Sequence, residues 1–153
     1  MKQTPEQKRI EDNLRAGALS AEGFLGDDTR SLTDIIRDDQ AMVEQLGLSH
    51  KTIAARLRAL TEAGTTGLGR PVLIDGYLAV IVEDYRGEIP CPFRDHASFA
   101  KQLTTCTDQN SKRAIRWSDL NVHMIEAHGF YEGRGSSFRL EPAEIREILF
   151  QAF

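Results

Sequence analysis

Hydrophobic positions repeat at helical intervals through the first 64 residues and predict three helices. The first is capped by Thr4, has a proline at its first position and extends to about Ala18. The second is capped by Ser31 and continues without a break for about four turns. The third covers residues 50–63, between the N-cap Ser49 and Gly64. The inward positions are Ile10, Leu14, Leu32, Ile35, Ile36, Val43, Leu46, Ile53, Leu57 and Leu60.

From residue 65 the pattern changes to that of β-strands. Residues 72–74 and 77–84 flank an Asp75-Gly76 pair, which predicts a hairpin. Because the chain from Leu78 to Val82 is apolar at every position, we expect this strand to be buried on both faces. Residues 103–107 and 113–117 predict a second hairpin. Prolines exclude residues 89–93 from a central strand, and residues 95–100 are predicted to form a short helical turn.

Two further helices are predicted near the end of the sequence. Ser118 caps residues 119–128, which end at Gly129, and Pro142 begins a helix whose apolar positions face inward. The whole pattern predicts an α+β fold with N-terminal helices, an antiparallel sheet of about four strands and two C-terminal helices. Residues 1–64 and 65–153 are expected to form a helical region and an α+β region, or to share one compact domain.

Composition limits the function only loosely. The formal net charge is −4, so the molecule as a whole does not attract nucleic acid. No apolar run is long enough to span a bilayer and no secretory signal is recognisable, so we expect a cytoplasmic protein without a membrane partner. In that compartment Cys91 and Cys106 are expected to be reduced thiols.

Residues 46–64 have the order of a helix-turn-helix motif, with Gly47 in the turn. His50, Lys51 and Thr52 would lie at the start of the second helix, where such motifs contact base edges. Arg56 and Arg58 add to a local excess of positive charge, although an ordinary solvated helix face would carry a similar pattern.

The order of residues within this segment also matches a known pattern. It comprises Gly47-Leu48-Ser49, Thr52-Ile53, Arg56-Leu57-Arg58, Leu60 and Glu62-Ala63-Gly64. This order resembles the recognition-helix segment of bacterial winged-helix transcription regulators, the leucine-responsive type among them. The resemblance implies a DNA-binding regulator with a C-terminal sensing or dimerising domain, whose partners are duplex DNA and a second copy of the chain. The hairpin at residues 72–84 would be the wing, but its continuous apolar strand and acidic tip differ from a solvent-exposed wing.

A second group of candidate residues lies in the second half of the chain. Cys91, His96, His123 and His128 are of the types that bind zinc, with Glu126 as a further candidate. His123 and His128 differ by about 140° around a regular helix, so we expect at most one to bind a metal unless the helix ends before His128. This set supports a metal- or small-ligand-binding domain, possibly enzymatic. The alternative is ordinary packing, with hydrogen-bonded histidines and a buried Cys91 thiol.

The glycine-rich residues 133–139 offer a third candidate site. Arg134, Ser136, Ser137 and Arg139 could hold a phosphate or carboxylate, but a flexible turn explains the same residues. Residues 117–139 as a whole resemble a group of bacterial proteins with no assigned activity, so the resemblance implies none. A structural or protein-interaction role without a site of its own remains the third hypothesis.

Overall fold

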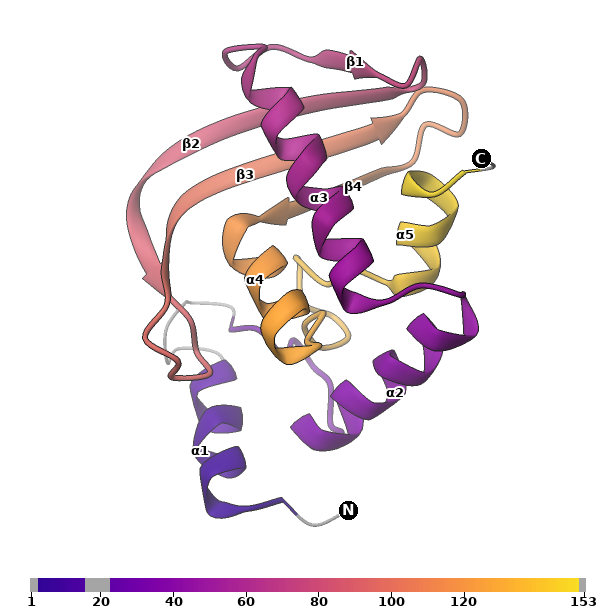
Figure 1. The fold of residues 1–153 in the computed structure, drawn as a ribbon. Helices are drawn as coiled ribbons and strands as arrows, with labels where there is room; N and C mark the ends of the chain where they lie inside the picture. Colours follow the sequence, from indigo (N-terminus) through magenta and orange to yellow (C-terminus); the bar gives the residue numbers. More distant parts are fainter. Residues whose placement is uncertain (1–2, 16–22, 152–153) are drawn as a thin grey trace.

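The computed structural model describes residues 3–15 and 23–151. The elements follow the predicted α+β order, with three helices, a four-stranded sheet and two further helices (Figure 1). They are α1 (Pro5–Leu14), α2 (Leu32–Gln45), α3 (His50–Thr65), β1 (Val72–Ile74), β2 (Leu78–Pro90), β3 (Ser98–Asp108), β4 (Ala114–Ser118), α4 (Asp119–His128) and α5 (Pro142–Leu149).

The sheet is antiparallel and its strands lie in sequence order, β1-β2-β3-β4. Asp75 and Gly76 both have positive φ angles, as the predicted tight hairpin turn between β1 and β2 requires. The β2–β3 hairpin is much longer than its neighbours and carries a bulge between Tyr85 and Glu88. Figure 1 shows it curving towards α1, so that its tip lies far from the β1 end of the sheet.

The strand ends beside the hairpin tip (residues 91–97) correct one prediction. Residues 98–100 belong to β3 rather than to a helical turn. Pro90 ends β2, where it is paired with Ser98. It can lie there because β1 pairs only with Leu78, Ala79 and Val80, so this part of β2 has a single neighbour and one free edge.

One face of the sheet is covered and the other is not. Leu78, Val80 and Val82 are buried beneath the helices, whereas Ala79 and Ile81 are partly exposed, so the prediction of two buried faces is wrong. The helix α3 crosses the covered face (Figure 1). Gly64 lies within α3 and permits this approach, because a Cβ there would lie 2.7 Å from the side chains of Val80 and Val82.

The buried apolar side chains form two clusters. The first joins α3, the sheet and α5 around Trp117, so the regions 1–64 and 65–153 share one core. The second joins α1, α2 and α4 to the hairpin tip, where Leu14, Met124 and Phe130 pack with Cys91. The helix α1 ends at Leu14, because Arg15 is extended, and the predicted continuation to Ala18 lies outside the described residues.

Candidate metal centre

The hairpin tip between β2 and β3 forms a closed turn. The Cys91 backbone N–H donates to the carbonyl of Ala97 at 2.8 Å, and the Arg94 N–H donates to the carbonyl of Cys91 at 3.2 Å. Asp95 lies between two non-glycine residues with positive φ, Arg94 at 62° and His96 at 68°. Such conformations cost about 1–3 kcal/mol each and persist only where the surroundings hold them. The turn therefore holds Asp95 in a defined orientation.

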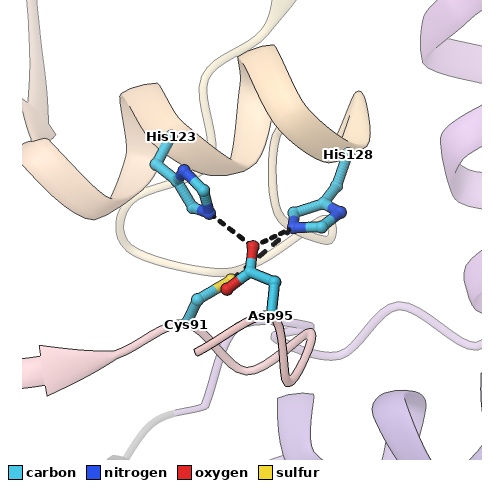
Figure 2. Close-up of side chains that lie close together, drawn as sticks. All are labelled: Cys91, Asp95, His123 and His128. Carbon is cyan, nitrogen blue, oxygen red and sulfur yellow. Dashed lines mark hydrogen bonds and ion pairs between the residues drawn. The ribbon is translucent and has the colours of Figure 1, made fainter. Parts of the chain in front are cut away.

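The helix α4 presents two histidines to this turn. His123 Nε2 and His128 Nε2 each lie 2.7 Å from the same oxygen of Asp95, and His128 Nε2 lies 3.7 Å from Cys91 Sγ (Figure 2). The prediction that these histidines could not converge is therefore wrong. Met124, which is buried, lies between the two histidines around the helix, and the left-handed Gly129 ends α4 directly after His128.

The separations suit a small metal ion. The four ligand atoms lie within 4.8 Å of one another. Bond lengths of about 2.0 Å to nitrogen and oxygen and 2.3 Å to sulfur give tetrahedral edges of about 3.5 Å for N···S and about 3.3 Å for N···O. The His128–Cys91 separation of 3.7 Å is close to the first value. The two 2.7 Å contacts are hydrogen bonds, which would lengthen by about half an ångström around an ion. The cluster could hold a metal ion.

Aromatic rings orient both imidazoles. Phe93 stacks on His128 with ring centroids 4.1 Å apart and planes only 6° from parallel. Phe99 lies against His123, with centroids 4.9 Å apart, and Phe93 in turn contacts the edge of Phe130. Because these rings belong to the packed tip and to the second core cluster, the imidazole planes are fixed before any ion binds.

The protonation states follow from burial and hydrogen bonding. Cys91 is 5% exposed, and burial raises the pKa of its thiol to about 12. Burial also opposes ionisation of Asp95, but hydrogen bonds from His128, the Ala97 backbone and His123 outweigh it and lower the pKa of the carboxyl. An ionised carboxylate can only accept, so both Nε2 atoms carry the proton. Without a metal, the cluster is a carboxylate held by two imidazoles beside a neutral thiol.

Three of the four predicted ligands meet, and the fourth does not. His96 lies outside the cluster and lines an adjacent cleft, while Glu126 pairs with Arg58 at 2.9 Å. The fourth member of the cluster is Asp95, which the sequence pattern did not predict, in the place expected for His96. The signal that could have identified it is the carboxylate four residues after Cys91, in the turn that follows Pro90 and Pro92.

The residues predicted to contact DNA have mixed environments. Lys51 and Thr52 are exposed at the start of α3. His50 is half-buried, with Nδ1 2.7 Å from the hydroxyl of Tyr131. Arg56 is bound to Asp75 and to the carbonyl of Leu149.

The glycine-rich loop is packed rather than open. Arg139 is buried in a bidentate ion pair with Asp39, at 2.8 and 2.9 Å. The Ser136 hydroxyl donates to Glu132, whereas Arg134 and Ser137 are exposed. A Cβ on Gly133 would lie 2.2 Å from the carbonyl of Leu25, so the glycines serve close packing of residues 133–135 on the loop at residues 25–28.

No helix in the described part of the chain is both long and apolar enough to cross a membrane. Comparison of the chain with family models, with curated proteins and with solved structures finds no match.

Proposed function

We propose that the protein binds one zinc ion through Cys91, Asp95, His123 and His128, and that the ion fixes the β2–β3 hairpin tip to α4. The observation that carries this proposal is the convergence of four potential ligand atoms, from two distant segments, within 4.8 Å. The aromatic packing and the strained turn around Asp95 support it, because both orient the ligands in advance.

The ligand types favour zinc over other common ions. Magnesium and calcium prefer cages of oxygen atoms, and here three of the four ligand atoms are sulfur or nitrogen. One thiolate, two imidazoles and one carboxylate in a tetrahedral arrangement are typical of zinc. All four positions are filled by protein groups, which is the pattern of a structural zinc site rather than a catalytic one.

A structural ion has a clear role at this position. The hairpin tip lies beyond the parts of β2 and β3 that pair with β1 and β4. It is held by its own strand pairing, by the second core cluster and by a bond from Asn13 to the carbonyl of Pro92. An ion shared with α4 would add a crosslink across 28 to 37 residues of sequence.

The test is metal binding by the full-length chain after chelation. Elemental analysis and titration with zinc should give one ion per chain. His123→Ala and Asp95→Asn should each weaken zinc binding by about a hundredfold or more, because each removes a ligand. His96→Ala is the matched control, since this histidine adjoins Asp95 but lies outside the cluster. Circular dichroism would establish that each variant is folded.

Two outcomes would refute the proposal. The first is a folded wild-type protein that binds no stoichiometric zinc. The second is a His96→Ala variant that loses as much affinity as His123→Ala, since the ligands would then differ from those in Figure 2.

Duplex DNA binding and a homodimer stay predictions. A helix-turn-helix would use the exposed start of α3, where Lys51 and Thr52 lie. A duplex would have to compete with Asp75 for Arg56 and with Glu126 for Arg58, at ion-pair distances of 2.8 and 2.9 Å. Metal binding is therefore the function that we propose in preference to DNA binding.

A further inference from the structure

A cleft of about 590 Å³ lies beside the metal cluster, between α1 and the hairpin tip. Arg9 and Glu6 line it from α1, while Cys91, Arg94 and His96 line it from the tip. Successive residues of the tip therefore belong to two different sites. Asp95 belongs to the metal cluster, whereas its neighbours Arg94 and His96 line the cleft. Cys91 belongs to both.

The two arginines of this cleft have free guanidinium groups. Within the described residues, neither Arg9 nor Arg94 makes a side-chain hydrogen bond or ion pair, whereas Arg30 and Arg139 are held by carboxylates. The two arginines come from different elements, Arg9 from α1 and Arg94 from the hairpin tip. Among the described lining residues Glu6 is the one carboxylate, so these residues carry a formal charge of +1.

We propose that this cleft binds the oxyanion group, carboxylate or phosphate, of a small molecule, with Arg9 and Arg94 as its cationic contacts. A guanidinium donates two parallel N–H bonds to such a group, and these charge-assisted bonds are among the stronger ones available to a protein. Because both groups are free, binding an anion would not require an internal ion pair to break.

The shared Cys91 couples this cleft to the metal cluster, and this step rests on the proposed zinc site. Zn²⁺ brings two positive charges, and the Cys91 thiol can release at most one proton when it binds the ion. Metal binding therefore makes the wall of the cleft more positive by at least one charge. Zinc should strengthen anion binding, and by linkage the anion should strengthen zinc binding equally.

The experiment is calorimetric titration of the full-length protein with inorganic phosphate, and separately with succinate, at low ionic strength. Both titrations use the zinc-free and the stoichiometrically zinc-loaded protein. Arg9→Gln and Arg94→Gln should each weaken binding of the favoured anion by about tenfold. Arg86→Gln is the matched control, because this arginine is exposed on β2 and does not line the cleft. Zinc loading should strengthen wild-type binding by about fivefold.

Each outcome bears on a separate claim. Absence of saturable binding of either anion, or equal losses in Arg86→Gln and Arg94→Gln, overturns the anion site. A preference for phosphate or for succinate identifies the oxyanion. Equal affinities with and without zinc overturn the coupling alone. If phosphate binds but zinc does not, the proposed metal site is wrong and the anion site stands.

Discussion

The pH dependence of zinc binding offers a sharp test of the metal centre. Metal binding needs the thiolate of Cys91, but burial raises the pKa of this thiol to about 12. At pH 7 its ionisation therefore costs about 7 kcal/mol, or about five powers of ten in zinc affinity. Asp95 adds no such cost, because its hydrogen bonds lower the pKa of its carboxyl and it is already ionised.

The sign and slope of the pH dependence of zinc affinity follow from the ionisation of the Cys91 thiol. Each unit of rising pH increases the thiolate fraction tenfold, so zinc affinity should rise about tenfold per unit between about pH 7 and pH 9. Each imidazole can bind the metal through Nε2, since its ring proton can move from Nε2 to Nδ1. Competition with a chromophoric chelator across this range measures the affinity, and calorimetry in buffers of different ionisation enthalpy counts the released proton.

Cys106 provides the matched control for this measurement. It is also a buried thiol whose pKa is raised to about 12 by burial, but it lies in the first core cluster and outside the metal cluster. Cys106→Ala should keep both the zinc affinity and the slope, whereas Cys91→Ala should lose most of the affinity and the slope with it. Zinc binding by the wild type that releases no proton, or that keeps its slope in Cys91→Ala, would refute the assignment of Cys91 as a ligand.

Three further measurements test the fold and the DNA hypothesis. In urea denaturation, Ile53→Ala should lower the free energy of unfolding by about 2–5 kcal/mol. Ile81→Ala should lower it by less than half as much, because Ile81 lies on the partly exposed face of the sheet. Equal losses would mean that this face is covered. Asp39→Ala should lower the free energy of unfolding by about 1.5–3 kcal/mol, because Arg139 loses its two bonds to Asp39 but keeps its ion pair with Glu141. A loss below about 0.5 kcal/mol would contradict this. If the protein binds duplex DNA, Lys51→Ala should weaken binding and reduce the slope of log affinity against log salt concentration by about one. Absence of wild-type binding at low salt would exclude the regulator hypothesis.

The sequence by itself determined the elements that depend on near neighbours. Thr4 and Ser118 form the capping boxes that begin α1 and α4, and Asp75-Gly76 forms the turn between β1 and β2. These signals act over two to four residues, through a hydrogen bond or a backbone angle, so they can be recognised without knowing the rest of the fold. The order of helices and strands then predicted the α+β class.

Only the tertiary structure decided how α4 meets the hairpin tip. The angle between His123 and His128 on an ideal helix predicted divergence, but the length of the imidazoles and a partner placed between them allow convergence. That partner is Asp95 rather than His96, because the positive φ angles of the tip direct neighbouring residues to different sides. The bulge between Tyr85 and Glu88 is a local feature that bends the long hairpin, but the contact of its tip with α4 results from packing of the whole sheet and core.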